Sequence, residues 1–282
     1  MPALLADPAV AAVLATAFGL LVGSFLNVVI HRLPRMLERG WVEQCAELRG
    51  EQAPSASAYN LIVPRSACPA CGHQIRAFEN IPVVSWILLR GKCSACKAPI
   101  PVRYPVVELL GGLLAGFAVW RFGGTWQGLA ACVLLWSLTA LTFIDADTQL
   151  LPDDLTLPLL WAGLIANLFE LFAPLASAVT GAIAGYVSLW MVYWAFKLIR
   201  GKEGMGYGDF KLLAALGAWL GWQMLPLIVL LSSVVGAVIG IALIAFRGRE
   251  KSAPLPFGPY LAIAGMIALF WGKPLLRLYL PA

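Results

Sequence analysis

Stretches of mainly apolar residues alternate with polar connections along the 282-residue chain. A helix that crosses a bilayer needs about 20 consecutive mainly apolar residues. The pattern therefore predicts an all-α polytopic membrane protein with about eight transmembrane helices, embedded in the lipid bilayer. The predicted helices cover residues 9–30, 105–121, 127–144, 155–172, 175–197, 210–222, 224–246 and 257–277. The sixth segment is short for a span, and its boundary with the seventh can be drawn differently around Gly221 and Trp222.

The composition supports the membrane assignment. Hydrophobic residues make up 60% of the chain and charged residues only 12%, whereas about 25% of a soluble domain is charged. The formal net charge of +5 raises nucleic acid as a partner. The basic residues lie beside apolar stretches rather than along one soluble face, so we expect no nucleic-acid binding.

The distribution of Lys and Arg predicts the orientation. Cytoplasmic loops of membrane proteins carry an excess of these residues. With the N-terminus outside, 17 of the 20 Lys and Arg residues fall on the inner side and three on the outer side. The sequence therefore predicts a multi-pass membrane protein with its N-terminus on the outer side of the membrane.

Three domains follow from this pattern. Residues 1–30 form the first transmembrane helix, residues 31–104 a polar cytoplasmic domain, and residues 105–282 the remaining helical bundle. Small residues at positions 19, 23 and 24, together with Asn27, share one face of the first helix. Such a face favours close packing against another helix.

The cytoplasmic domain contains two CxxC pairs, Cys68 with Cys71 and Cys93 with Cys96. This spacing is typical of a structural zinc site with four cysteine ligands, similar to a zinc ribbon. A reducing cytoplasm disfavours disulfides. The alternatives are a redox-active CxxC pair, unliganded cysteines, or His73 in place of one cysteine. Cys45 and Cys132 stand apart from the pairs.

Two aspartates lie where apolar stretches meet the inner side of the membrane. Asp145 ends the third predicted helix, and Asp209 begins the sixth after three glycines, Gly204, Gly206 and Gly208. A carboxylate at a membrane edge is costly to desolvate and usually has a function. Helix capping is the alternative for Asp209. Among the neighbouring acids, we expect Asp147 to be solvated and Asp153 or Asp154 to cap a helix.

These two aspartates fall at one depth on the cytoplasmic face, which suggests an aspartic protease. Two close carboxylates share one proton, so one can deprotonate a water while the other donates to a scissile carbonyl. The glycines would leave room for an extended substrate. The sequence has only two histidines and no His-Glu metalloprotease pattern. We therefore assign Asp145 and Asp209 as the candidate catalytic residues.

The chain resembles the type IV prepilin peptidases. The resemblance rests on motifs in the family's order, namely Gly23-Ser-Phe-Leu-Asn-Val-Val-Ile-His-Arg-Leu-Pro34, the CxxC pairs, Asn80-Ile-Pro-Val-Val-Ser-Trp86, Arg103-Tyr-Pro-Val-Val-Glu108, the segment from Ile144 to Asp153, and Gly206-Tyr-Gly-Asp209. It implies an endopeptidase of the bacterial inner membrane, with a periplasmic N-terminus, that removes the basic leader of type IV prepilins and type II secretion pseudopilins on the cytoplasmic side. By motif position, Asp145 and Asp209 match the catalytic aspartates.

The resemblance also implies a second activity, N-methylation of the new N-terminus with S-adenosylmethionine as methyl donor. The sequence contains no glycine-rich Rossmann loop, so the residues that bind this cofactor stay unassigned. Three other functions compete with the peptidase: a non-enzymatic scaffold of a secretion system, an ion-coupled transporter, and a methyltransferase without protease activity. The oligomeric state does not follow from the sequence.

Overall fold

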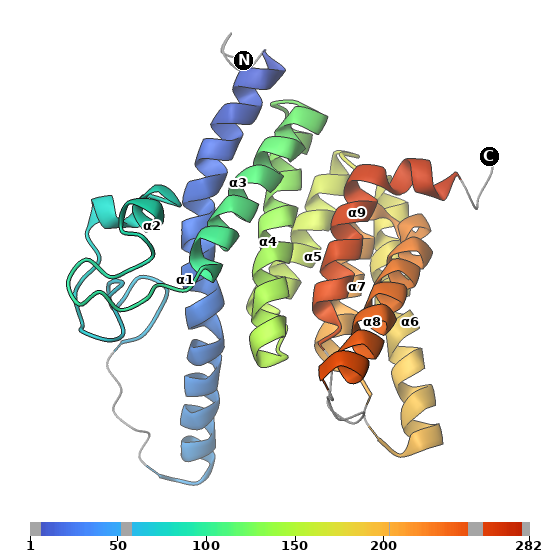
Figure 1. Cartoon of the computed structure of the whole chain (residues 1–282). Helices are drawn as coiled ribbons and strands as arrows, with labels where there is room; N and C mark the ends of the chain where they lie inside the picture. Colours follow the sequence, from blue (N-terminus) through green and yellow to red (C-terminus); the bar gives the residue numbers. More distant parts are fainter. Residues whose placement is uncertain (1–6, 52–57, 203, 248–255, 278–282) are drawn as a thin grey trace. The chain divides into compact units, whose positions relative to one another are not determined.

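The computed structural model describes residues 7–51, 58–202, 204–247 and 256–277, and these residues contain helices but no β-strand (Figure 1). The helices are α1 (Pro8–Leu48), η2 (Ala77–Asn80), α2 (Val84–Leu88), α3 (Arg103–Phe122), α4 (Trp126–Thr148), α5 (Asp153–Leu168), α6 (Leu175–Arg200), α7 (Tyr207–Leu220), η3 (Trp222–Met224), α8 (Leu225–Arg247) and α9 (Gly258–Leu276). The chain divides into two compact units, residues 1–140 and 141–282, and the boundary falls within α4.

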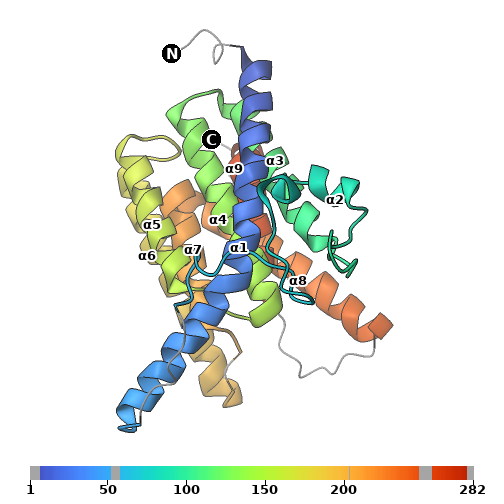
Figure 2. The ribbon, with the colours of Figure 1, turned by 90° about the vertical axis from the view of Figure 1, so that its left-hand side faces the viewer.

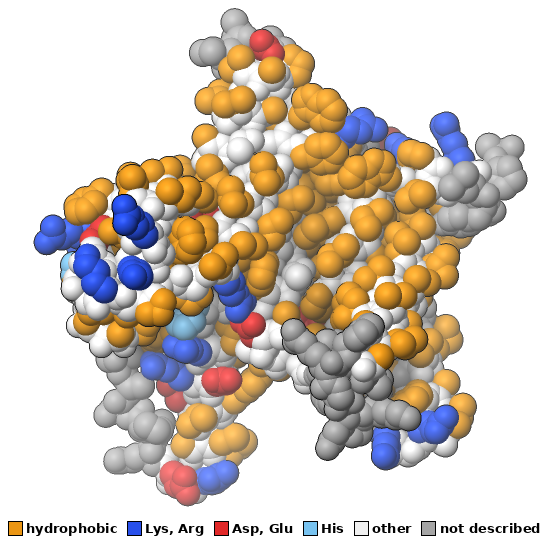
Figure 3. All heavy atoms as spheres, in the orientation of Figure 1, with side chains coloured by type: hydrophobic (Ala, Val, Ile, Leu, Met, Phe, Trp, Pro, Cys, Tyr) orange, Lys and Arg blue, Asp and Glu red, His pale blue; other side chains and the backbone are white. Residues whose placement is uncertain are grey.

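Six helices in the described part of the chain are long and apolar enough to cross a membrane: α1, α3, α4, α6, the segment Trp222–Ala242 and α9. The all-helical membrane fold is confirmed. Six of the eight predicted spans are thus supported. The predicted fourth and sixth spans form α5 and α7, which are shorter helices. Figure 3 shows hydrophobic side chains over the visible faces of the long helices, as expected for contact with lipid tails.

Helix α1 is longer than the sequence predicted. We expected the helix to end near residue 30, yet it continues to Leu48 and includes Pro34. The end of an apolar stretch marks where a helix leaves the hydrocarbon, not where its backbone hydrogen bonds stop. Residues 35–48 are rich in Arg, Leu, Met and Glu, which favour helix in water as well.

In the first unit, α1 and α3 lie side by side, as both views show (Figures 1 and 2). Glycines form the contact between the two helices. A methyl group on Gly19 would lie 2.5 Å from the Gly111 carbonyl oxygen, and one on Gly23 would lie 2.6 Å from Glu108 Cα. The amide of Asn27 donates to the Tyr104 carbonyl at 3.1 Å. The small-residue face of the first helix is therefore a packing face, as predicted.

In the second unit, α7 packs against α5, α6 and α9. Every residue from Asp209 to Leu220 except Lys211 is buried. A helix that is apolar all round belongs in the interior of a bundle, and this explains why so short a helix is stable here. Its backbone lies close to α6, because a methyl group on Gly185 would lie 2.6 Å from the Leu213 carbonyl oxygen.

Candidate active site and metal centre

Asp145 lies in the last turns of α4, where its side chain reaches the start of α9. Its carboxylate Oδ2 accepts a hydrogen bond from the Gly258 N–H at 3.0 Å, and only 4% of the residue is exposed. A methyl group on Gly258 would lie 2.7 Å from that same oxygen. The backbone N–H groups at a helix N-terminus stabilise a negative charge. The first residue of α9 therefore holds the Asp145 carboxylate in place.

Asp209 lies in the first turn of α7 and is also buried, with 7% exposed. Its carboxylate Oδ1 is fully shielded and has no hydrogen-bond partner within the described residues. A buried polar atom without a partner costs free energy, so such an atom usually has a function that its own chain does not satisfy. The hypothesis that Asp209 is only a helix cap does not explain this oxygen.

The two carboxylates are close enough for their charges to repel each other. Leu151, in the connection between α4 and α5, touches the backbone near both. A methyl group on Gly208 would lie 2.7 Å from Leu151 Cβ, and one on Gly258 would lie 3.1 Å from Leu151 Cδ1. Sequence reasoning missed Gly258 and Leu151, although Leu151 belongs to a motif that carried the family resemblance.

The neighbouring aspartates differ from this pair. Asp147 is exposed, as predicted. Asp153 and Asp154 occupy the first turn of α5, and Pro152 rather than either of them is the N-cap residue, so that detail of the prediction was wrong. The Asp153 carboxylate instead binds the Lys211 ammonium at 2.6 Å. This ion pair links the start of α5 to α7 on the exposed side of the bundle.

The two CxxC pairs sit in two turns with the same backbone pattern. In the first turn Cys68 N–H donates to the His73 carbonyl and Gly72 N–H to the Cys68 carbonyl. The second turn repeats both hydrogen bonds, because the Cys93 N–H donates to the Ala98 carbonyl and the Lys97 N–H to the Cys93 carbonyl. Gly72 and Lys97 occupy equivalent positions with positive φ of 72° and 62°. Repetition at this level is typical of the knuckles of a zinc ribbon.

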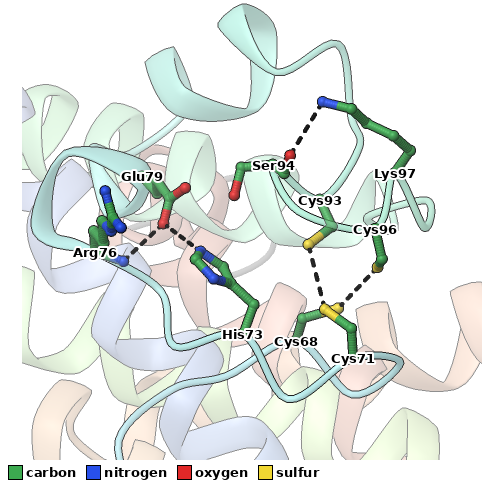
Figure 4. A network of polar contacts seen from close by, with 9 residues as sticks. All are labelled: Cys68, Cys71, His73, Arg76, Glu79, Cys93, Ser94, Cys96 and Lys97. Atoms are coloured by element: carbon green, nitrogen blue, oxygen red, sulfur yellow. Dashed lines mark hydrogen bonds and ion pairs between the residues drawn. The ribbon is translucent and has the colours of Figure 1, made fainter.

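The four sulfur atoms converge (Figure 4). All lie within 4.8 Å of one another, with Cys68 Sγ 3.8 Å from Cys96 Sγ and Cys71 Sγ 4.0 Å from Cys93 Sγ. A tetrahedral metal with metal–sulfur bonds of about 2.3 Å has sulfur–sulfur edges of about 3.8 Å. The cluster can therefore hold a tetrahedral metal ion. His73 is not one of its members, because its Nε2 lies 3.2 Å from the Glu79 carboxylate.

Glu79 is the centre of a polar network next to the cysteines (Figure 4). The Ser94 side chain, the Arg76 N–H and His73 all interact with its carboxylate and lower the pKa of Glu79 to about 2. The glutamate is thus ionised at neutral pH. It lines a cavity of about 340 Å³, which continues from the cysteine turns to Glu108 on α3. Apart from the motifs that border it, no sequence pattern predicts this cavity.

Comparison with known proteins adds to these observations. Residues 17–122 match the Bacterial Peptidase A24 N-terminal domain and residues 132–241 the Type IV leader peptidase family. The chain is 62% identical over 263 residues to the prepilin leader peptidase/N-methyltransferase of Pseudomonas aeruginosa, covering 93% of this chain and 91% of that protein. It is 59% identical over 278 residues to the enzyme of the same name from Stutzerimonas stutzeri, covering 98% and 96%.

A third relative, the prepilin leader peptidase/N-methyltransferase of Aeromonas hydrophila, is 60% identical over 268 residues, covering 93% of this chain and 91% of that protein. No solved structure matches the chain. Both halves of the sequence thus fall within one family along nearly their full length. The chain belongs to the type IV leader peptidase family.

Proposed function

We propose that this chain is an integral membrane enzyme that cleaves the leader from type IV prepilins and pseudopilins and then methylates the new N-terminus. Its relatives carry the names of both activities. The observation that carries the peptidase half is the unpartnered, buried Oδ1 of Asp209 beside the held carboxylate of Asp145. Both aspartates lie within the segment that matches the peptidase family.

The hydrolysis needs only one proton shared between the two carboxylates, because a second negative charge at close range is costly. The ionised carboxylate takes a proton from a water, and the water oxygen bonds to the scissile carbonyl carbon. The protonated carboxylate donates to the carbonyl oxygen. When the carbon–nitrogen bond breaks, the nitrogen receives a proton and the pair again holds one. The sum is addition of one water to one peptide bond, without a covalent enzyme intermediate.

The proposal includes the orientation of the chain in the membrane. The excess of Lys and Arg in the predicted inner segments favours a periplasmic N-terminus, with the aspartates on the cytoplasmic side. In this proposal the chain crosses the bacterial inner membrane eight times. A prepilin joins a basic leader to an apolar helix. The apolar part can lie among the transmembrane helices while the leader stays in the cytoplasm.

We further propose that the metal of the cysteine cluster is a structural zinc. Four cysteine ligands close the coordination shell, and such a site is a folding device rather than a catalyst. Residues 58–102 contain only the short helices η2 and α2 and two isolated bridges. So small a segment has little core of its own and benefits from a metal cross-link.

The methyl donor is S-adenosylmethionine, which supplies a methyl group bound to a positively charged sulfur. When bound, this donor would supply its methyl group to the amine nitrogen of the cleaved substrate, with S-adenosylhomocysteine and a proton released to water as the other products. The residues of this chain must bind the donor, offset its positive charge and exclude water from the reacting atoms.

Purified protein incubated with a prepilin and S-adenosylmethionine tests the assignment, with leader loss and N-terminal mass as readouts. Asp145→Asn and Asp209→Asn should each lower cleavage by roughly 10²–10⁴-fold, because each removes one partner of the proton exchange. Asp147→Asn is the matched control, since Asp147 is exposed on the same helix, and it should cleave normally. Normal cleavage by either active-site variant would favour a scaffold or a transporter.

A further inference from the structure

Several motifs of this chain lie outside the segment that matches the peptidase family, and they meet around one cavity. The cavity of about 340 Å³ lies entirely in the first unit. Its walls come from the cysteine turns, from the segment Asn80–Trp86 with the turn that follows, and from the first turns of α3 up to Glu108. This volume falls at the lower end of the range for small-molecule pockets, roughly 300–1,000 Å³.

Glu108 closes the cavity on the α3 side. Only 9% of this residue is exposed, and its backbone rests directly on Gly23 of α1. The carboxylate Oε2 accepts a hydrogen bond from the Val83 N–H at 2.7 Å, and the Ser24 side chain bonds to the same carboxylate. The motif around Gly23 and the motif ending at Glu108 therefore build one wall together.

The hydrogen bond between the Val83 N–H and Glu108 requires a strained backbone at Val83. Its φ is 62°, a conformation that a β-branched residue rarely adopts. Strain of this kind persists where the surrounding structure needs a group in a defined place, and it gathers at ligand sites. Here the strained turn directs a backbone N–H at Glu108 and orients the carboxylate.

Two acidic side chains thus line one small cavity, Glu108 on α3 and Glu79 in the network beside the cysteines. The Glu79 carboxylate is hydrogen-bonded to the His73 ring, and the Glu108 carboxylate accepts its hydrogen bonds from neutral groups. Enclosing two carboxylates together is unfavourable unless a positive charge enters with them. The cavity therefore suits a cationic ligand.

An aromatic wall completes the site. The Trp86 indole N–H donates to the Ile100 carbonyl at 3.1 Å, which fixes the plane of the ring. Gly91 lies against this ring, and a methyl group there would approach Trp86 Cζ2 to 2.9 Å. Tyr104 also lines the cavity. Indole faces attract cations and stack on flat bases.

We propose that this cavity is the binding site for S-adenosylmethionine, an inference that rests on the proposed methyl transfer. Glu108 and Glu79 offset the positive sulfonium and ammonium groups of the donor, and Trp86 provides a flat wall for its purine. Cys68 and Cys93 line the same cavity, so the metal of the cysteine cluster fixes one side of it. A structural metal thereby supports cofactor binding without taking part in the chemistry.

Equilibrium dialysis with labelled S-adenosylmethionine tests this site on the full-length, metal-containing protein in detergent. Wild-type protein should bind one equivalent, and S-adenosylhomocysteine should compete. Glu108→Gln and Trp86→Ala should each weaken binding at least tenfold. Glu38→Gln and Trp41→Ala are matched controls on the cytoplasmic extension of α1, outside the cavity, and should bind like wild type.

The outcomes separate the two proposals. Wild-type protein that binds no S-adenosylmethionine would overturn both the site and the methyl-transfer half of the proposed function. Binding that is unchanged in Glu108→Gln and Trp86→Ala would overturn the site alone. Photo-crosslinking of labelled cofactor to wild-type protein guards against variants that misfold. The label should map to peptides between residues 67 and 108, and a label confined to residues 145–260 would place the cofactor elsewhere.

Discussion

The glycines around Asp209 have different surroundings, although the sequence suggested one shared use for them. Among the described residues, a methyl group on Gly206 would meet only the Gly208 nitrogen, at 4.0 Å, whereas one on Gly208 would lie 2.7 Å from Leu151 Cβ. Within the described part of the chain, Gly206 thus borders open space. Gly208 instead lets the connection between α4 and α5 approach the start of α7, next to Asp209.

This difference predicts opposite outcomes for two matched substitutions. Gly208→Ala should lower leader cleavage by on the order of tenfold to a hundredfold, because the displaced Leu151 shifts the backbone beside Asp209. Gly206→Ala should cleave nearly as well as wild type, since its φ of −83° suits alanine. The rates can be measured by gel shift of a prepilin. Recovery of cleavage in the double variant Gly208→Ala/Leu151→Gly, which removes Leu151 Cβ, would attribute the loss to this contact, and equal effects of both single substitutions would contradict it.

Gly258 offers a second test at the scale of one residue. Gly258→Ala places a methyl group 2.7 Å from Asp145 Oδ2 and should displace this carboxylate from the α9 N-terminus. We expect a lower kcat with little change in the amount of folded protein. The control is Gly40→Ala in α1, where an added methyl group meets none of the described residues within 4 Å. Unchanged cleavage by Gly258→Ala would show that α9 does not position Asp145.

Among the helices, α7 is held at its far end by one buried side chain. The amide of Asn167, at the end of α5, donates to the carbonyls of Ala218 and Trp219 at 2.8 and 2.9 Å. Its Oδ1 accepts from the N–H groups of Phe172 and Ala173. One asparagine thus ties the ends of α5 and α7 to the following turn, and so steadies the helix that begins with the active-site motif.

Replacing this asparagine should destabilise the second unit. Asn167→Leu leaves buried backbone groups without partners, at roughly 1–3 kcal/mol for an unsatisfied group. We expect a lower Tm in detergent by tryptophan fluorescence. Thr180→Val is the control, because the Thr180 hydroxyl bonds only within its own helix and is exposed. A Tm unchanged in Asn167→Leu would mean that packing alone holds these ends together.

The cysteine turns are a further element with a direct test. Cys71→Ser removes one of four ligands and should abolish the roughly one metal ion per chain that we expect in wild-type protein. The first unit should then become sensitive to protease between residues 58 and 102. Cys45→Ser is the control, since Cys45 lies outside the cluster. Metal analysis by mass spectrometry gives the readout, and metal-free wild-type protein would remove the zinc proposal.

For the whole molecule, the charge distribution predicts which side of the membrane each connection faces. An impermeant maleimide should label the exposed Cys45 in inverted membrane vesicles but not in intact spheroplasts. A cysteine introduced by Lys273→Cys should show the reverse pattern. Peptide mass spectrometry distinguishes the two positions. Labelling of Cys45 in spheroplasts would invert the proposed topology and place the aspartates in the periplasm.

The sequence by itself determined the helical membrane fold, the four-cysteine cluster and the two candidate aspartates. These features follow from composition, short spacing or charge, which are properties of neighbouring residues. It misplaced the end of α1, because a fall in hydrophobicity does not stop helix formation.

Only the tertiary structure decided which distant residues meet. The contact of Gly258 with Asp145 joins residues 113 apart, and the cavity at Glu108 depends on a strained backbone at Val83. Such contacts depend on how helices pack. A local pattern such as the small-residue face of α1 indicates close packing but does not identify the residues that it packs against. Hence the sequence indicated the two aspartates, whereas the packing of α4, α7 and α9 decides how their carboxylates are held.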